Sequence, residues 1–232
     1  MSKFADHNVT EIDSPLEPSV GISYRETSAG LDLKRGFDLV SVLIILTIAA
    51  PVMIVLWLLV RLDGGPGLYG HERVGRGERT FRCLKFRTMV TNADTVLAEL
   101  LAADIRAREE WEASRKLVND PRVTRIGWLL RATSLDELPQ LLNVLRGDMS
   151  LVGPRPVVRA ELDQFYRGEY RAAYLSVRPG VTGLWQVSGR SDASYDRRVA
   201  FDLEYVANAS MGMDLTILWR TVGAVLRRRG AY

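Results

Sequence analysis

Two adjacent carboxylates with cations near them in the sequence are the residues best suited to chemistry. Asp136 and Glu137 lie in the stretch TSLDELPQLLNVLRGDMSLVGPRP, with Arg131 five residues before the pair and Arg155 near its end. Carboxylates accompanied by arginines are typical of a site that handles phosphorylated substrates, because a guanidinium can bind two phosphate oxygens at once. An ionised aspartate in such a site can act as a nucleophile.

The same pair also has a purely structural interpretation. Ser134 and Glu137 form the pattern Ser-x-x-Glu, in which the serine side chain caps a backbone N–H at a helix start and the glutamate reaches back. This pattern places both acids in the first helical turn, where the helix dipole favours their ionised form. Taken alone, the motif favours a helix cap over a catalytic pair.

Further cations are spaced so that they can meet one anion. Lys85 and Arg87 alternate in KFRTM, so they share one face if this stretch is a strand, although a solvated strand face is the alternative. Arg155 has a proline on each side, which restricts the backbone around it. The turn-rich stretch RPGVTGLWQVSGR adds Arg178 and Arg190.

Composition excludes several other classes of site. The 31 basic and 28 acidic residues are well mixed and give a formal charge of only +3, which does not indicate a nucleic-acid-binding protein. Cys83 is the only cysteine, so the chain forms no internal disulfide. With His7 and His71 as the only histidines, a zinc site made of His and Cys is excluded as well.

An apolar run provides the element that must position the site relative to a membrane. Leu39 to Val60 contains 22 residues without a charge, and a helix of that length is roughly 33 Å long, enough to cross a bilayer. Pro51 lies just past the middle of the run and predicts a kink. Basic residues flank both ends, namely Lys34 and Arg35 before the run and Arg61, Arg73, Arg76 and Arg79 after it.

These flanking charges favour a re-entrant helix. The positive-inside rule places both ends in the cytoplasm, which a straight helix cannot satisfy. A helix that bends at Pro51 and returns to the same face can, while a single pass and a buried core helix remain alternatives. Asp38 is expected to pair with Lys34 or Arg35 at headgroup depth, or to be a solvated residue at the helix start.

We therefore expect three parts. Residues 1–32 form a mobile leader without an assigned function, residues 33–61 form the re-entrant membrane helix, and residues 62–232 form a cytosolic domain that carries the candidate catalytic pair. The expected fold class is α+β, with the proline-kinked helix followed by a mostly helical domain that carries a small β-hairpin and interfacial amphipathic helices.

Individual elements of this domain can be predicted from their patterns. LYGHERV and TFRCLKFRTM flank the turn GRGE and predict the hairpin. Residues 92–118 predict one amphipathic helix, and RIGWLLRATS predicts a short helix that leads into the acidic pair. Residues 214–226 have an apolar face followed by three arginines, which predicts either a helix in the membrane interface or one packed on the core with a solvated basic end.

Several short motifs occur together from Lys34 to the C-terminus. In chain order they are KRGFD, the proline-broken apolar run, KFRTM, SLDELPQL, GDMSLVGPRP and RPGVTGLWQVSGR. In this order and spacing they resemble the bacterial sugar transferases that are monotopic phosphoglycosyl transferases, and most of all the short members that initiate exopolysaccharide synthesis. Many members have serine before the membrane proline, whereas this chain has Ala50, which removes a hydroxyl that could bond a freed carbonyl.

The resemblance implies an activity and assigns roles to matching residues. Such enzymes transfer galactose 1-phosphate or glucose 1-phosphate from a UDP-hexose to undecaprenyl phosphate. Asp136 and Glu137 match the catalytic dyad and are expected to bind Mg²⁺, which takes carboxylate and phosphate oxygens. Lys34, Arg35 and Asp38 match the motif before the membrane helix. The residues expected to bind substrate phosphates are Lys85, Arg87, Arg131 and Arg155, with Arg178 and Arg190 as further candidates.

The expected reaction has two steps. Asp136 attacks the β-phosphorus of the UDP-hexose and expels UMP, and undecaprenyl phosphate then takes the phosphosugar from the aspartate. The resemblance implies a location at the bacterial inner membrane, among its lipids, with the catalytic domain facing the cytoplasm. A homo-oligomer and later exopolysaccharide enzymes are left open as further partners. The alternatives are a catalytically silent membrane-anchored assembly factor, a peripheral lipid-binding protein, and a glycosyltransferase that releases UDP.

Overall fold

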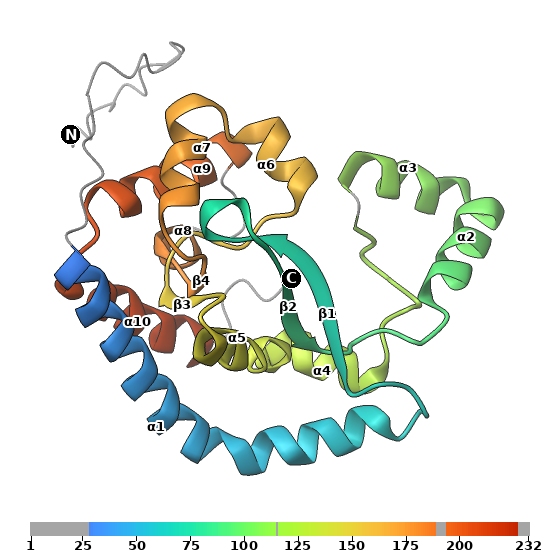
Figure 1. Ribbon diagram of the computed structural model, residues 1–232. Helices are drawn as coiled ribbons and strands as arrows, with labels where there is room; N and C mark the ends of the chain where they lie inside the picture. The colour runs from blue at the N-terminus through green and yellow to red at the C-terminus, as the bar shows by residue number, and fades with distance from the viewer. Residues whose placement is uncertain (1–27, 115, 189–193, 227–232) are drawn as a thin grey trace, which may run out of the picture.

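The computed structural model describes residues 28–114, 116–188 and 194–226, and these residues are mostly helical with two small sheets (Figure 1). Residues 1–27, Arg190 and the three arginines at 227–229 lie outside the described residues. The helices after the membrane candidate are α2 Ala93–Ala103, α3 Ile105–Ser114, α4 Arg125–Thr133, η2 Leu135–Glu137, α5 Gln140–Arg146, α6 Arg159–Phe165, α7 Gly168–Ser176, α8 Leu184–Ser188, α9 Tyr195–Ala207 and α10 Met211–Leu226.

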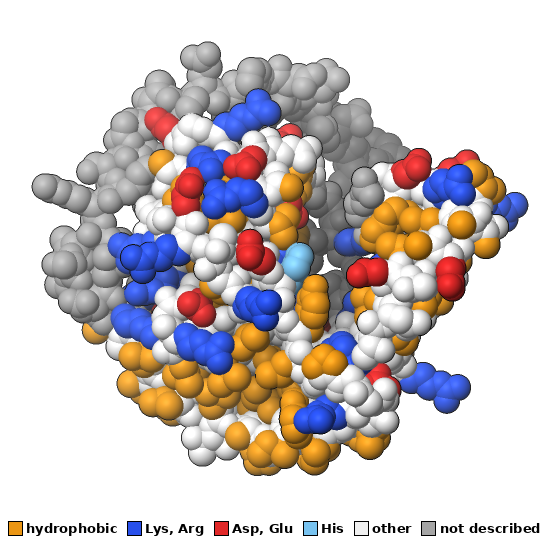
Figure 2. Space-filling model, turned by 45° about the vertical axis from the view of Figure 1, so that its right-hand side comes forward, with side chains coloured by type: hydrophobic (Ala, Val, Ile, Leu, Met, Phe, Trp, Pro, Cys, Tyr) orange, Lys and Arg blue, Asp and Glu red, His pale blue; other side chains and the backbone are white. Residues whose placement is uncertain are grey.

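Helix α1, Ser28–Arg61, follows one edge of the molecule and changes direction along its length (Figure 1). Its segment Leu33–Arg61 is long and apolar enough to cross a membrane, judged by length and composition alone. Pro51 lies inside the helix. One side of α1 is an exposed apolar surface, which contributes to the orange base of the molecule in Figure 2 and includes Val40, Leu43, Ile44, Ile48, Val52, Ile54, Val55 and Leu58.

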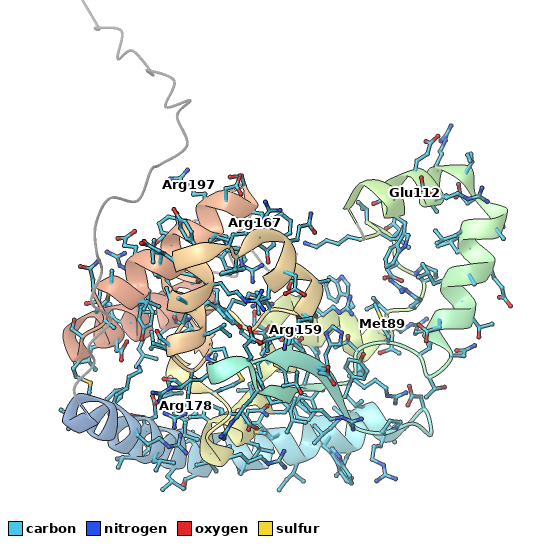
Figure 3. The ribbon with its side chains drawn as sticks, turned by 45° about the horizontal axis from the view of Figure 1, so that its top comes forward. Met89, Glu112, Arg159, Arg167, Arg178 and Arg197 are labelled. Atoms are coloured by element: carbon cyan, nitrogen blue, oxygen red, sulfur yellow. The ribbon has the colours of Figure 1, made fainter. Side chains whose placement is uncertain are left out.

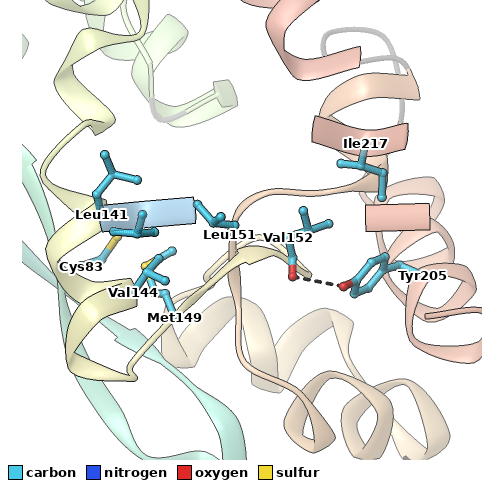
Figure 4. Close-up of a cluster of buried hydrophobic side chains, with 9 residues drawn as sticks. Cys83, Leu141, Val144, Met149, Leu151, Val152, Tyr205 and Ile217 are labelled. Atoms are coloured by element: carbon cyan, nitrogen blue, oxygen red, sulfur yellow. Dashed lines mark hydrogen bonds between the residues drawn. The ribbon is translucent and has the colours of Figure 1, made fainter. Parts of the chain in front are cut away.

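The opposite side of α1 belongs to the protein core. Val42 is fully buried in a cluster with side chains of α5, α9 and α10 and of strand β3, Ser150–Val152 (Figure 4). In the second half of the helix, Leu56 and Val60 pack with Phe86 and with Leu130 of α4. Both halves of α1 therefore contact the same domain.

Two basic side chains near the start of α1 fasten it to the rest of the chain. Lys34 Nζ lies 2.5 Å from Asp214 Oδ2 of α10. Arg35 donates to the backbone oxygens of Val144 at 2.7 Å and Leu145 at 3.1 Å, near the end of α5. Both carbonyls lie in the last turn of α5, where the Gly147 N–H also donates to the Val144 oxygen at 3.0 Å, so the guanidinium adds to the capping of the helix end.

Asp38 is buried, with 2% of its surface exposed, and the two predictions made for it are both wrong. Its carboxylate accepts hydrogen bonds from Ser150 Oγ at 2.7 Å and from the backbone N–H of Leu151 at 3.2 Å. Since Lys34 and Arg35 bind other helices, Asp38 is left to join α1 to strand β3. A buried carboxylate is tolerated here because both of its oxygens are hydrogen-bonded.

The predicted hairpin is confirmed. Strand β1, Leu68–Val74, pairs antiparallel with β2, Thr80–Phe86, and the turn between them contains η1, Arg76–Glu78. The register pairs Tyr69 with Lys85, near the end of β2. The hairpin thus directs its last residues toward the segment that contains the acidic pair, with which β2 is in contact.

A second, parallel pair of strands holds the loop that contains Arg155. Strand β3 pairs with β4, Gly180–Thr182. Gly153 and Gly180 allow a close backbone approach, since a Cβ on Gly180 would lie 2.1 Å from the Gly153 nitrogen. The loop after β3 is therefore held against the start of β4.

The predicted helix over residues 92–118 is instead two helices, α2 and α3, which form an arm beside the main body (Figure 1). The break comes at Asp104, whose Oδ1 accepts hydrogen bonds from the backbone N–H groups of Arg106 and Ala107. A side-chain acceptor at this position starts a new helix. In α10, Ile217 is buried while Trp219 is 79% exposed, so this helix both packs on the core and presents an apolar surface.

Replacement of Asp38 tests the attachment of α1. Asp38→Ala leaves the Ser150 hydroxyl and the Leu151 N–H buried without an acceptor, so the free energy of unfolding should fall by about 3 kcal/mol. The measurement is thermal or denaturant unfolding of the detergent-solubilised protein. Glu99→Ala, an exposed acid on α2, is the matched control and should change little. Equal stability of the two variants would contradict this role.

Candidate active site

A large cavity, with a volume of about 2810 Å³, brings the acidic pair together with residues from distant parts of the chain. Its wall includes residues of the hairpin, the α2–α3 arm, η2, α8 and α9. Figure 2 shows the molecule hollowed between the arm and the main body. Ligand pockets are typically roughly 300–1,000 Å³, so this cavity has room for two substrates.

The acidic pair lies directly after α4, in the short 3-10 helix η2. Ser134 ends α4 in the left-handed conformation, at φ 56°, and its backbone N–H donates to carbonyls in the last turn of that helix. Its side chain makes no cap hydrogen bond to η2, so the predicted capping box is wrong. Ser134 is at once the C-cap of α4 and the N-cap of η2, and both acids lie in the first turn of η2 as predicted, but Glu137 contacts cations instead of closing a capping box.

Two of the predicted cations contact the acids. Lys85 Nζ lies 2.6 Å from Glu137 Oε1 and 3.5 Å from Asp136 Oδ2. Arg155 NH2 lies 3.5 Å from the same Glu137 oxygen. The hairpin, the η2 turn and the loop after β3 therefore meet at the two carboxylates.

The two acids have different electrostatic environments. Burial raises the pKa of Asp136 above its usual range, although the charge of Lys85 opposes this. Burial also acts to raise the pKa of Glu137, but the charges of Arg155 and Lys85 outweigh it and lower the value to about 2. Glu137 is therefore ionised at any physiological pH and neutralises the cations, while Asp136 is the less stabilised anion.

The other predicted cations have different positions. Arg131 lines the cavity and donates from Nε to Thr88 Oγ1 at 2.9 Å. Arg87 also reaches the cavity wall, but its guanidinium contacts Asp63 and the carbonyls of Val60 and Pro66. Arg87 thus fastens the turn after α1.

Arg178 lies in a different environment from the acids. It is absent from the described wall of the cavity, and its Nε donates to the Gly147 carbonyl at 2.9 Å (Figure 3). This contact joins the segment before β4 to the end of α5. Arg190 lies outside the described residues. The roles of these arginines in substrate binding stay predictions.

Two further side chains line the cavity. Trp185 of α8 lies within the motif RPGVTGLWQVSGR, whereas Arg198 of α9 lies in no motif that the sequence singled out. Behind them, Asp202 of α9 is buried and accepts a hydrogen bond from the Tyr166 hydroxyl at 2.6 Å. Burial raises the pKa of Asp202 to about 6. No local pattern could identify Arg198 in SYDRRVAFD, because an arginine pair on an amphipathic helix usually indicates a solvated face.

Comparison with known proteins identifies the family. A family model described as "Bacterial sugar transferase" matches residues 29–228. The chain belongs to the bacterial sugar transferase family. The resemblance inferred from the sequence motifs is thus confirmed.

Named relatives of this sugar transferase include proteins from several bacteria. An "Undecaprenyl-phosphate galactose phosphotransferase" of Salmonella typhimurium is 58% identical over 201 residues, which are 86% of this chain and 42% of that protein. "Exopolysaccharide production protein ExoY" of Rhizobium meliloti is 51% identical over 86% of this chain and 88% of its own length. A "UDP-glucose:undecaprenyl-phosphate glucose-1-phosphate transferase" of Caulobacter vibrioides is 41% identical, with coverages of 86% and 72%. The chain therefore spans less than half of the Salmonella relative.

The acidic pair of this sugar transferase has suitable donors for a divalent cation, although the described residues contain no cluster of three His, Cys, Asp or Glu side chains for one. Asp136 and Glu137 supply carboxylate oxygens, which are the ligands that Mg²⁺ prefers. Mg²⁺ commonly needs only one or two carboxylates when substrate phosphates and water complete its coordination. The residues present therefore fit Mg²⁺ bound together with a phosphorylated substrate.

Substitution of each acid by its amide tests the electrostatic difference between them. A lowered pKa means that ionised Glu137 stabilises the fold above pH 4.5 and that this stabilisation disappears as the pH falls toward 2. Glu137→Gln should therefore lower the free energy of unfolding by about 2 kcal/mol at pH 7, and by less near pH 3. The raised pKa of Asp136 has the opposite sign, so Asp136→Asn should be as stable as the native protein or more stable at pH 7.

Unfolding curves at the two pH values provide the measurement. Glu99→Gln on the exposed face of α2 is the control for loss of one surface charge. A larger loss of stability in Asp136→Asn than in Glu137→Gln at pH 7 would show that this assignment of the two environments is wrong.

Proposed function

We propose that this chain transfers a hexose 1-phosphate, from galactose or glucose, from a UDP-hexose to undecaprenyl phosphate and releases UMP, as the first membrane step of exopolysaccharide synthesis. The observation that carries the proposal is the contact of Asp136 and Glu137 with Lys85 and Arg155 inside a cavity that a long apolar helix borders. The names of the relatives agree with this activity. Undecaprenyl phosphate is a lipid, so such an enzyme needs both a phosphate site and a membrane element.

In the first step, an Asp136 carboxylate oxygen attacks the β-phosphorus of the UDP-hexose. The bond from that phosphorus to the bridging oxygen breaks, UMP leaves with the electron pair, and the sugar phosphate is bound to Asp136 as an acyl phosphate ester. In the second step, a phosphate oxygen of undecaprenyl phosphate attacks the same phosphorus, which yields the lipid diphosphate sugar and restores the carboxylate. The burial that raises the pKa of Asp136 also removes water that would stabilise its charge, which supports a nucleophilic role.

The cations and Glu137 have supporting roles in this scheme. Lys85 and Arg155 contact Glu137 before substrate binds, and the same groups can bind phosphate oxygens when the diphosphate enters. Arg131 reaches the cavity from α4 and adds a third positive charge. Asp136 and Glu137 would hold Mg²⁺, which when bound neutralises part of the diphosphate charge.

We also propose that α1 is re-entrant at the inner membrane, that Pro51 causes its change of direction, and that the catalytic domain faces the cytoplasm. Support comes from the packing of both halves of α1 on the same domain, through Val42 before Pro51 and through Leu56 and Val60 after it. A helix that crossed the bilayer would carry its second half to the other side. The exposed apolar surfaces of α1 and α10 would then face lipid.

A UMP-release assay tests the reaction. Purified protein mixed with a panel of UDP-hexoses and Mg²⁺, without lipid, should release one equivalent of UMP from its substrate and gain the mass of a hexose phosphate on the peptide that contains Asp136. Asp136→Asn should show neither the burst nor the mass. Release of UDP, or of UMP only after undecaprenyl phosphate is added, would contradict the covalent scheme.

Cysteine labelling tests the topology. Cys83 is the only cysteine and is buried, so Cys83→Ser provides a background for single cysteines at the exposed positions Leu33 and Leu62. In intact spheroplasts, both positions should be protected from a membrane-impermeant maleimide and should react after permeabilisation. Labelling of one position alone in intact spheroplasts would indicate a single pass instead.

A further inference from the structure

Arg198 has an unusual position for an arginine that lines the cavity. Its Nε is buried and has no hydrogen-bond partner, and Arg198 forms none of the ion pairs found in the described part of the chain. By contrast, Lys85 and Arg155 are both paired with Glu137. The carboxylates of Asp202 and Glu161 act electrostatically on Arg198, but neither lies at ion-pair distance from its guanidinium.

Aromatic rings hold Arg198 in place. Its Cζ lies 5.0 Å from the centroid of the Trp185 ring and 4.9 Å from that of Tyr195. Tyr195 in turn stacks on Phe165, with 3.7 Å between the ring centroids. These cation–π contacts hold the guanidinium without using an N–H donor.

Trp185 connects Arg198 to the acidic pair. The same indole ring lies 6.0 Å from the Cζ of Arg155, whose NH2 is 3.5 Å from Glu137. Among the described residues, the buried indole Nε1 also has no hydrogen-bond partner. Two buried N–H donors without a partner in this part of the chain, one of them cationic, therefore lie on one flank of the site where the phosphorus is transferred.

The N–H donors on this flank indicate which of the two substrates binds there. On the leaving side of its reacting phosphorus, a UDP-hexose carries one further phosphate and a base with carbonyl acceptors, whereas undecaprenyl phosphate carries one phosphate and an apolar chain. We propose that Arg198 and Trp185 bind the nucleotide moiety of the sugar donor, which becomes the leaving UMP. This inference rests on the proposed function and names the part of the donor that these two residues recognise.

Arg198→Gln tests this subsite, and Arg197→Gln is its matched control. Arg197 is the preceding residue of the same helix, is exposed, and lies on the outer side of α9 (Figure 3). In Arg198→Gln, the Kd of UMP measured by calorimetry and the KM for UDP-hexose should each rise about tenfold, the effect expected for loss of a charge-assisted contact to an anionic ligand. The KM for undecaprenyl phosphate should stay within about twofold of the native value, and Arg197→Gln should leave all three values unchanged.

A second variant covers the case in which Arg198→Gln does not fold. Trp185→Phe keeps an aromatic ring for both arginines but removes the indole N–H, and it should weaken UMP binding by about threefold to tenfold. Native affinity for UMP in both folded variants, or an increased KM for undecaprenyl phosphate alone, would overturn the proposal.

The failure of this inference can be distinguished from failure of the proposed function. If the native protein releases no UMP from any UDP-hexose and binds none, the proposed function fails. If the native protein does both and the folded variants Arg198→Gln and Trp185→Phe retain native UMP affinity, only the nucleotide subsite is wrong.

Discussion

The attachment of α1 to the catalytic domain is the constraint on which the rest of the structure depends. Three charged residues near the start of this helix bind three different segments: Lys34 binds α10, Arg35 binds the end of α5, and Asp38 binds β3. Helix α5 follows the acidic pair, and β3 leads into the loop that contains Arg155. The segments on both sides of the site are thus held in place by contacts with one helix, α1. Asp38 and Asp214 are buried, and each carboxylate has a partner. Loss of a partner would leave the buried carboxylate without compensation for its lost hydration.

The acidic pair shows how neighbouring residues of the same chemistry are made different by their surroundings. Glu137 receives both Lys85 and Arg155, and its negative charge is correspondingly stabilised. Asp136 is buried, and its one ion pair among the described residues is a longer contact with Lys85. Its negative charge is therefore less stabilised, and its pKa is raised. One carboxylate therefore pairs with the cations, and the other is the group to which the proposed function assigns the attack on phosphorus. A pair with divergent pKa values is a common arrangement where two acids divide their roles.

Local patterns predicted the hairpin, the helix before the acids and the apolar helix, because strand alternation, turn residues and length are properties of a short stretch of sequence. Prediction failed where a partner is distant in the chain or where two motifs overlap. Asp38 binds Ser150, which is 112 residues away, and no pattern in the sequence around Asp38 predicts this contact. The serine of the apparent capping box ends α4 and also begins η2, and its side chain makes no cap hydrogen bond to η2. Arg198 enters the cavity only because α9 packs beside α8, which is a tertiary contact without a sequence pattern.

The α2–α3 arm contributes more to the wall of the cavity than to the stability of the fold. Helix α2 buries none of its side chains, yet residues of the arm and of the segment after it form one side of the cavity wall. Stability depends mainly on buried contacts, so substitutions on this arm affect the fold less than substitutions in the core. The arm is thus the part of the wall in which sequence can diverge among related proteins without loss of the framework. Substitutions on the arm could therefore change which ligands the cavity accepts at little cost in stability. The opposite wall is part of the core and tolerates fewer changes.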